Sequence, residues 1–463
     1  MKAKARKLTP SVTEVPSAQY LSLIWQHLTE SLCEEVFAAT RNRERQRKWT
    51  LFALVWFWLG LLQSRFGSQT RALLEARAGH PLFPLVDAAP EAFFQKIQNV
   101  RPVFFQNLFR TYTARLYTDI APRFQADLGV DPKDFPAIFA IDGSRLAKVG
   151  RLLKVARSTT KAIIPGSMEA VYDLRRGHLH ELCFDPDGCV AEISMFQKVL
   201  DSIPAGSLLV NDRYYAKPVI WRDLGARSIS MVTRHNKTVK KHKIEVLSKL
   251  RTATLCVDDW IVEMGGSQHS EQSVRLRWVH VWNGDFDITL LTNVLDPKRL
   301  TPRQLLALYR HRWSVERMYL AMKEVLELNH LFNCSPAAVG QQVYATAILY
   351  NTLRASQALI AERAGIPPEA LSVDKLFPTL IDHYIKATYM MAGVHEVLDR
   401  LRAEHPRLRA PRIMIDHPSL RIRLQDHLLE KRTEKRRRRR YCQGRKHWTS
   451  YNKIPGAKKL LVN

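Results

Sequence analysis

The segment YRHRWSVERMYLAMK, residues 309–323, places one carboxylate among cationic, aromatic and aliphatic side chains. The surrounding residues 303–327 contain no proline or glycine. Before them, Thr301 and Pro302 have the pattern of a helix N-cap followed by proline at the first helical position. The sequence therefore predicts one continuous helix across this segment.

One face of that helix carries four polar groups. Positions seven and four residues before a given residue, and seven residues after it, return to nearly the same side of a helix. Counted from Glu316, these positions hold Tyr309, Arg312 and Lys323. A stripe of this kind is often only a solvated surface with a Glu–Arg ion pair, so a chemical role requires a second observation.

The length and the net charge restrict the classes of protein to consider. With 463 residues, the chain exceeds the size at which a single core usually stops growing, which predicts two or three domains. Its formal charge of +27 indicates a polyanionic partner: DNA, RNA or an acidic membrane surface.

The positive charge is concentrated near the C-terminal end of the sequence. Residues 431–459 contain thirteen Lys or Arg and one Glu. This tail is either a solubilising segment or one that phosphates neutralise, with Tyr441, Trp448 and Tyr451 available to stack on bases or sugars.

The sequence argues against a membrane-spanning or secreted protein. The longest apolar run, residues 51–62, has twelve residues, fewer than the roughly 20 needed to cross a bilayer, and it predicts a buried helix. The basic residues 1–10 lack the apolar segment of a secretory signal. The six cysteines form no Cys-x-x-Cys pair, which favours a reduced, cytoplasmic protein without structural zinc.

A change of hydrophobic period at residue 135 indicates the core. Short apolar strands then alternate with helices, which predicts an α/β core with a mixed sheet. Two of the strands end in an acid, Asp142 in IFAIDGS and Asp212 in GSLLVNDRYY. The other segments are predicted to be helical (18–127 and 340–403), a β-rich insertion (236–286) and a strand that returns to the core (287–293).

These two aspartates and Glu316 are the second observation. Sites in open α/β sheets gather at the carboxyl ends of strands, and Glu316 follows a third strand. Three carboxylates that converge there suit hard divalent cations, typically Mg²⁺. Two such ions could activate a water or a 3′-hydroxyl and stabilise the leaving oxygen of a phosphodiester. Either aspartate alone would be explained as a turn residue or a helix cap, whereas the three acids and the positive charge together favour this chemistry.

The spacing of the third motif resembles that of a known family. The pattern Y-x2-R-x3-E-x6-K is similar to the signature of insertion-sequence transposases of the DDE superfamily, in particular the branch called insertion sequence family four. The resemblance covers roughly residues 135–355, including the strand LLTNVLDP before the Glu helix. The matching residues are Asp142 in IDGS, Asp212 in NDRYY, and Tyr309, Arg312, Glu316 and Lys323 in the third motif.

The resemblance implies a site, cofactors and partners. Asp142, Asp212 and Glu316 would be catalytic and would hold two Mg²⁺ ions, with Mn²⁺ as a substitute. Arg312 and Lys323 would bind phosphates beside the reacting bond, and Tyr309 would contact the DNA backbone or order the helix. The partners would be the transposon's terminal inverted repeats and target double-stranded DNA, bound by a homodimer in the bacterial cytoplasm, at the nucleoid. These readings, and the absence of a membrane partner, are expectations.

The resemblance also implies an α/β, RNase H-like mixed-sheet catalytic core with a β-rich insertion and helical flanking regions. The predicted parts are a helical N-terminal region that binds DNA ends (1–130), the first part of the core (135–235), the insertion (236–286), the remainder of the core with the Glu helix (287–355), a helical C-terminal region suited to dimerisation (356–430) and the basic tail (431–463).

One position departs from the family's pattern. Members that form a hairpin intermediate can use a tryptophan in the strand before the Glu helix to hold a flipped base, and Ile288 occupies this position here. Trp260, Trp278 and Trp282 lie nearby in the sequence and are alternatives, although packing is the better explanation of each, so the sequence does not support the hairpin route.

Two other functions remain open from the sequence. An RNase H-like nuclease or resolvase would share the acids but would not join strands. A catalytically silent DNA-binding relative would keep the basic surfaces and lose an acid, and the presence of all three acids counts against it.

Overall fold

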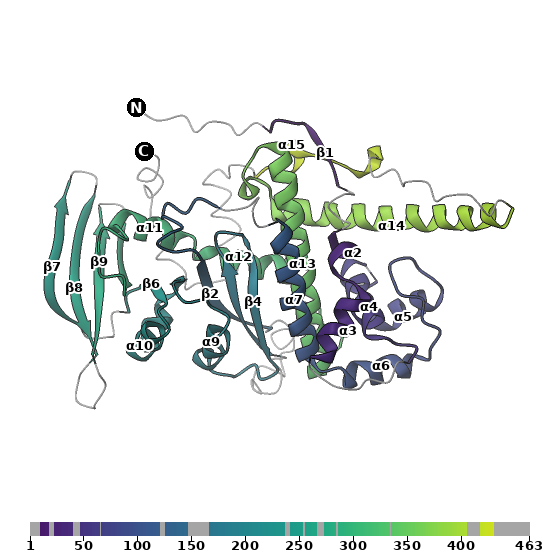
Figure 1. Cartoon of the computed structure of the whole chain (residues 1–463), viewed down its shortest axis with the longest axis horizontal. Helices are drawn as coiled ribbons and strands as arrows, with labels where there is room; N and C mark the ends of the chain where they lie inside the picture. Colours follow the sequence, from purple (N-terminus) through teal and green to yellow (C-terminus); the bar gives the residue numbers. More distant parts are fainter. Residues whose placement is uncertain are drawn as a thin grey trace, which may run out of the picture.

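The computed structural model of the chain combines a helical region with a large mixed sheet (Figure 1). The basic tail lies outside the described residues, so its predicted role is untested. The structure describes residues 10–17, 23–39, 47–64, 66–120, 126–146, 166–236, 241–252, 255–265, 273–283, 286–333, 335–404 and 417–429.

The N-terminal region is helical, as its sequence predicts. The apolar run forms α4, and eleven residues of this helix are buried, so the expectation of a buried helix is confirmed. Within the described residues, no helix is long and apolar enough to cross a membrane. The helices are α2 (Leu23–His27), α3 (Glu30–Ala38), α4 (Leu51–Gln63), α5 (Gln69–Arg77), α6 (Pro90–Asn99) and α7 (Pro102–Ile120).

Five strands form the central part of the sheet, in the order β4-β3-β2-β5-β6. Strand β2 pairs antiparallel with β3, which pairs antiparallel with β4, whereas β2, β5 and β6 are parallel. Three antiparallel strands followed by two parallel strands in this order are the arrangement of an RNase H-like core, so the predicted fold class is confirmed. The strands are β2 (Ile138–Arg145), β3 (Ser167–Asp173), β4 (His178–Asp185), β5 (Leu208–Asn211) and β6 (Ser230–Arg234).

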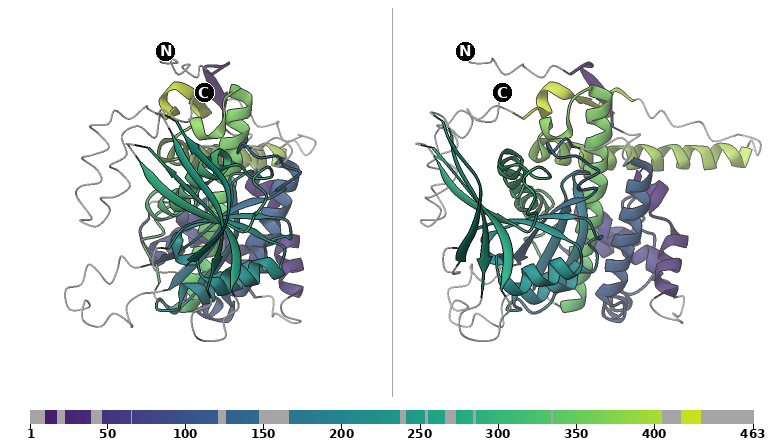
Figure 2. Two further views of the ribbon diagram at one scale, coloured as in Figure 1. Left: turned by 90° about the vertical axis from the view of Figure 1, so that its left-hand side faces the viewer. Right: turned by 60° about the vertical axis from the view of Figure 1, so that its left-hand side comes forward.

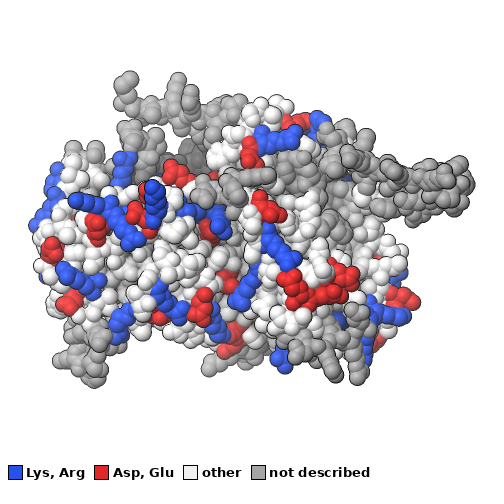
Figure 3. All heavy atoms as spheres, in the orientation of Figure 1, with Lys and Arg blue, Asp and Glu red and all other residues white. Residues whose placement is uncertain are grey.

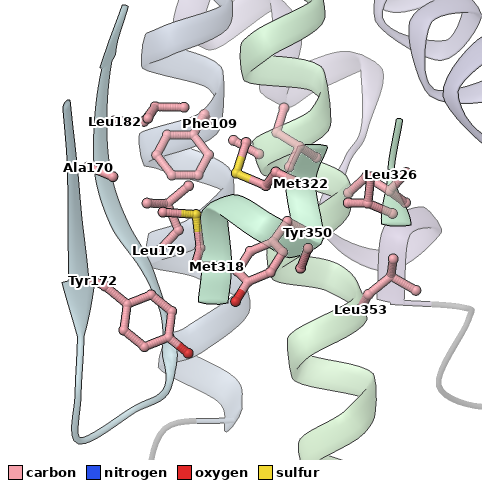
Figure 4. Packing of buried hydrophobic residues seen from close by; sticks show 14 of the residues in the cluster. Phe109, Ala170, Tyr172, Leu179, Leu182, Met318, Met322, Leu326, Tyr350 and Leu353 are labelled. Carbon is pink, nitrogen blue, oxygen red and sulfur yellow. The ribbon is translucent and has the colours of Figure 1, made fainter. Parts of the chain in front are cut away.

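Helices cover both faces of this sheet (Figure 2). On one face, α9 (Glu192–Leu200) and α10 (Pro218–Ala226) bury a compact cluster that includes Phe196 and Trp221. On the other face, the helix that carries Glu316 lies between the sheet and the central helices α7 and α13 (Pro336–Ala364). Figure 4 shows Met318 and Met322 packed among Ala170, Leu179, Phe109 and Tyr350, which fixes the helix against strands β3 and β4.

The predicted β-rich insertion does not form a separate sheet. Strands β7 (Lys241–Arg251), β8 (Cys256–Met264) and β9 (Val274–Trp282) continue the core sheet through β10 (Asp287–Thr292), which pairs antiparallel with β6. The result is one nine-stranded sheet with β7 at its edge. Both faces of β7 are largely exposed, whereas β8 and β9 are half-buried or buried along much of their length.

The prediction of one continuous helix over residues 303–327 is wrong. Helix α11 (Pro302–Arg310) begins at the predicted N-cap, where Thr301 and Gln304 form a capping box. It ends before a tight turn at His311 and Arg312, and α12 (Trp313–Leu320) follows, continued by a π-helical segment, Ala321–Val325. The turn is made by hydrogen bonds to carbonyls three residues back, from His311 to Leu308 and from Arg312 to Tyr309. Such i−3 bonds tighten the helix locally and change the angle between the residues before and after them.

The C-terminal region is also mainly helical. Helix α13 is buried on nearly all sides, and α14 (Val373–Glu404) extends away from the rest of the molecule (Figures 1 and 2). Near the ends of the described chain, β1 (Glu14–Pro16) pairs antiparallel with β11 (Arg421–Arg423), which is followed by the short helix α15 (Leu424–His427). The two ends of the described chain are therefore joined in one small sheet.

Candidate active site

Asp142 lies in the last part of β2, where the parallel pairing with β5 has ended at Ala140. Its carboxylate Oδ1 accepts a hydrogen bond of 3.0 Å from the backbone N–H of Gly143. Its carbonyl oxygen accepts one of 3.0 Å from the hydroxyl of Tyr319, on the helix of Glu316. This bond fixes α12 to the strand end.

Asp212 directly follows β5, the parallel neighbour of β2. Because the carboxyl ends of parallel strands meet at one edge of a sheet, the two aspartates lie at neighbouring strand ends. Buried Asn211 connects them, since its Oδ1 accepts a hydrogen bond of 3.3 Å from the N–H of Ile141. On the other side, Thr233 donates a hydrogen bond of 2.7 Å to the carbonyl of Asp212.

Glu316 forms an ion pair with Arg312 across one turn. Arg312 Nη1 lies 2.7 Å from Glu316 Oε1, and the two side chains are 8% and 27% exposed. The Nε–H of Arg312 is buried and has no hydrogen-bond partner in the structure. The guanidinium thus neutralises Glu316 and still has a donor available for another acceptor.

The electrostatics of the three acids are coupled. Burial raises the pKa of Asp142 to about 7; Arg312 lowers it, and Glu316, Glu192 and Asp212 raise it. Burial also raises the pKa of Glu316, which Arg312 lowers and Asp212 raises. Ionisation of Asp142 and Glu316 therefore costs free energy in this structure, and Arg312 offsets only part of that cost. A bound cation at these strand ends would offset more of it.

The donor set suits a hard divalent cation, but the acids are not closely gathered in this structure. Carboxylate oxygens are the ligands that Mg²⁺ prefers, and the mutual repulsion at Asp142 favours an added cation. Among the residues that the structure describes, no three His, Cys, Asp or Glu side chains form a group that could hold a metal ion. Glu316 instead points its oxygen to Arg312.

The other two residues of the third motif, Tyr309 and Lys323, make contacts within the protein. Tyr309 is 3% exposed and belongs to the hydrophobic core, so of its two predicted roles the structure favours ordering of the helix. Lys323 donates hydrogen bonds of 2.6 Å to Ser144 Oγ and 2.8 Å to the carbonyl of Arg145. Burial lowers its pKa to about 8. In this conformation, Lys323 therefore holds the end of β2.

The tryptophans of the insertion are covered by cations. Lys243 Nζ lies 4.0 Å from the ring centroid of Trp260, and Lys241 Nζ lies 4.7 Å from that of Trp278. The ring of Trp282 has Arg251 at 4.5 Å and stacks on a histidine, His280. Ile288 is 6% exposed and packs in the core.

Sequence reasoning missed three residues beside the strand ends. Glu169 is 1% exposed on β3, Glu192 begins α9, and the hydroxyl of buried Tyr215 lies within hydrogen-bond distance of both carboxylates. The available signal was the acid Glu169 among the apolar and aromatic residues of MEAVY in this strand, because a buried carboxylate requires a partner.

An RNase H-like sheet with acids at adjacent strand ends and on the following helix is the arrangement expected of a DDE transposase, and an RNase H-like nuclease would share it. Residues 134–352 match the family model described as the transposase DDE domain. This segment includes Asp142, Asp212 and Glu316, together with the whole third motif.

Known proteins add two similarities. A protein of Sinorhizobium fredii (strain NBRC 101917 / NGR234), described as "Putative transposase y4zB", is 29% identical over 159 residues. The alignment spans 33% of this chain and 43% of that protein, less than half of the relative's length. A cryo-EM structure of the piggyBac transposase synaptic complex with hairpin DNA aligns with 87% of this chain and 86% of its own chain, at a TM-score of 0.38 and 11% identity. That weak likeness carries no conclusion about function.

Substitution of Arg312 by Lys tests the role of the guanidinium. If Arg312 holds Glu316 with one edge and a phosphate with its Nε side, an ammonium cannot maintain both contacts. Arg312→Lys is expected to fold and to cleave DNA at least about tenfold more slowly in single-turnover assays. Arg317→Lys is the matched control, because Arg317 is exposed on the same helix. Cleavage by Arg312→Lys at the parental rate would leave only a simple charge role.

Proposed function

We propose that the chain is the transposase of a bacterial insertion sequence, which binds the element's terminal inverted repeats and catalyses metal-dependent DNA cleavage and strand transfer. The observation that carries this proposal is the position of Asp142, Asp212 and Glu316 on β2, after β5 and on α12, within a transposase DDE domain. Their electrostatic coupling supports a shared cation site.

The acidic and the basic residues of the site would have different roles. Asp142, Asp212 and Glu316 would hold two Mg²⁺ ions, or Mn²⁺, and the ions would supply Lewis-acid activation of the attacking oxygen and stabilisation of the leaving oxygen. Arg312 would bind a phosphate through its free Nε–H. Lys323, through Ser144, would keep the end of β2 in place, or would exchange that contact for a phosphate when DNA binds.

The DNA partners follow from charge as well as from the family. Figure 3 shows Lys and Arg distributed over the described surface with Asp and Glu among them, so the described part has no single-sign face in that view. Residues 431–459 instead carry thirteen Lys or Arg and one Glu. In the proposal, residues 1–130 bind the DNA ends, residues 356–430 contribute to a homodimer on DNA, and the protein acts at the nucleoid in the cytoplasm.

Magnesium-dependent reactions with candidate end DNA test this function. The full chain is incubated with Mg²⁺ and DNA that carries the inverted repeats flanking its gene, and the products are separated on denaturing gels. Joined products are expected. Cuts without joining would favour the nuclease or resolvase, and retarded but uncut DNA would favour a silent DNA-binding relative.

Deletion of the basic tail gives a prediction about affinity. Each Lys–phosphate or Arg–phosphate contact releases counterions, with a slope of roughly 0.9 in log affinity against log salt for each phosphate neutralised. Removal of residues 431–463 is expected to weaken binding to end DNA and to random DNA by similar factors and to flatten this slope. Fluorescence anisotropy over a salt series measures both. Selective loss of end binding at an unchanged slope would mean that the tail recognises particular bases or a partner protomer.

A further inference from the structure

A second polar cluster lies beneath the strand ends, on the opposite face of the sheet from Glu316. Successive side chains of a strand alternate between faces. Asp142 pairs with Ala170, which faces α12, whereas Gly143 pairs with Glu169. Glu169 therefore points to the other face, where it meets Tyr215 from the turn after β5.

The hydroxyl of Tyr215 joins two carboxylates. It lies 2.7 Å from Glu169 Oε1 and 2.8 Å from Glu192 Oε1. A phenol has one proton to donate, so one of these two short contacts requires a proton from a carboxylic acid. Burial raises the pKa of Glu169 well above its ordinary value, with Glu192 and Asp142 raising it and the bond to Tyr215 lowering it. The short contacts and the burial of Glu169 therefore make the three groups one hydrogen-bonded unit.

Two members of this cluster, Tyr215 and Glu169, lie next to the two aspartates in the chain or in the sheet. Tyr215 ends the single helical turn Arg213–Tyr215, which starts directly after Asp212, and its N–H donates to the carbonyl of Asp212 at 3.1 Å. Glu169 Oε2 would lie only 2.8 Å from a Cβ at Gly143, the residue after Asp142. The absence of a side chain at Gly143 therefore leaves the space that the Glu169 carboxyl occupies.

We propose that Tyr215 is a positioning residue, which through its hydroxyl bonds to Glu169 and Glu192 holds the turn of Asp212 against the strand end of Asp142. The proposal rests on the proposed metal-dependent function and assigns the spacing of the two aspartates to a buried hydrogen-bond bridge. Partners of this kind, one step behind the metal ligands, commonly change metal affinity or activity by 10–100-fold when removed.

Metal binding without DNA tests the bridge directly. The full chain is titrated with MnCl₂ in an isothermal calorimeter, with wild type and Asp142→Asn as references. Tyr215→Phe, which removes only the hydroxyl, is expected to weaken Mn²⁺ affinity by about tenfold. Tyr112→Phe is the matched control, because Tyr112 is equally buried and its hydroxyl bonds Thr352 at 2.5 Å in the helical region. It is expected to keep wild-type affinity.

Substitutions at Glu169 separate positioning from a direct charge effect. Glu169→Gln keeps a neutral, hydrogen-bonding group and is expected to stay within about threefold of wild type. Glu169→Leu fills the same space without a polar atom and is expected to match the tenfold loss of Tyr215→Phe. If Tyr215→Phe does not fold by circular dichroism, Glu169→Leu decides the question.

The outcomes distinguish this inference from the proposed function. Wild-type affinity in Tyr215→Phe, or in Glu169→Leu, would overturn the positioning role. Equal losses in Glu169→Gln and Glu169→Leu would also overturn it, because the carboxylate charge would then act directly. If wild type does not bind Mn²⁺, or if Asp142→Asn binds it equally well, the metal site of the proposed function fails instead.

Discussion

Asp142→Asn is expected to lower the rate of DNA cleavage by roughly a thousandfold or more, about 4 kcal/mol of transition-state stabilisation, while DNA binding changes little. The carboxylate would hold metal at the reacting bond, whereas most of the affinity for DNA comes from phosphate contacts elsewhere. Asp212→Ala and Glu316→Ala are expected to behave in the same way. Single-turnover cleavage and gel retardation measure the two properties separately. Magnesium-dependent cutting by any one variant would remove that residue from the site.

Thermal stability provides the control for Asp142→Asn. Burial raises the pKa of Asp142 to about 7, so its ionised form costs stability, and this cost grows as the pH rises from the unfolded-state pKa through the folded-state value. Asparagine removes the charge. In metal-free buffer, the variant is therefore expected to melt at a higher temperature than wild type, with a larger gain at pH 8 than at pH 5. A lower melting temperature at pH 8 would mean that the lost cleavage reflects misfolding.

Asp259→Ala is expected to cause the largest loss of stability. Arg277 donates to both carboxylate oxygens of Asp259, at 2.8 and 2.5 Å, and both side chains are 0% exposed. Its Nη1 also donates to the carbonyl of Leu300, directly before the N-cap of α11. Removal of the acid leaves a buried, unpaired guanidinium, which costs about 3–5 kcal/mol of the free energy of unfolding. Urea denaturation measures this loss.

Two further variants test whether burial of the ion pair explains the loss of stability in Asp259→Ala. Asp258→Ala removes the acid of a neighbouring, more exposed ion pair, in which the Arg251 side chain is 49% exposed and the Asp258 side chain 19%. This variant is expected to lose no more than about 1 kcal/mol of the free energy of unfolding. The double variant Asp259→Leu with Arg277→Met removes both buried charges and is expected to recover most of the stability. An equal cost for Asp258→Ala and Asp259→Ala would contradict this explanation.

Local sequence patterns were sufficient for much of the fold. The alternation of short apolar strands with helices predicted the α/β core, and the Thr301-Pro302 pair predicted the start of α11. The apolar run of α4 is buried as expected. These features depend on hydrophobic period and on helix capping, which act over a few residues and can therefore be read directly from the chain.

The order in which the strands pair could be learned only from the tertiary structure. The β-rich insertion was expected between Asp212 and Glu316 along the chain, and only the structure shows that its strands extend the core sheet, because β10 pairs with both β6 and β9. The prediction of a continuous helix was wrong, since the buried surroundings of Tyr309 and Arg312 accommodate a tight turn that helix propensity alone does not indicate.

The sequence by itself determined which acids are candidates and which residues accompany Glu316, because motif spacing is a one-dimensional property. Only the tertiary structure decided what those side chains contact: Arg312 pairs with Glu316, Lys323 holds the end of β2, and Tyr309 is buried. It also brought Tyr215 to Glu169, which are 46 residues apart along the chain. Contacts of that kind depend on strand order and on the face to which each side chain points, and both are set by packing of the whole sheet rather than by any local pattern.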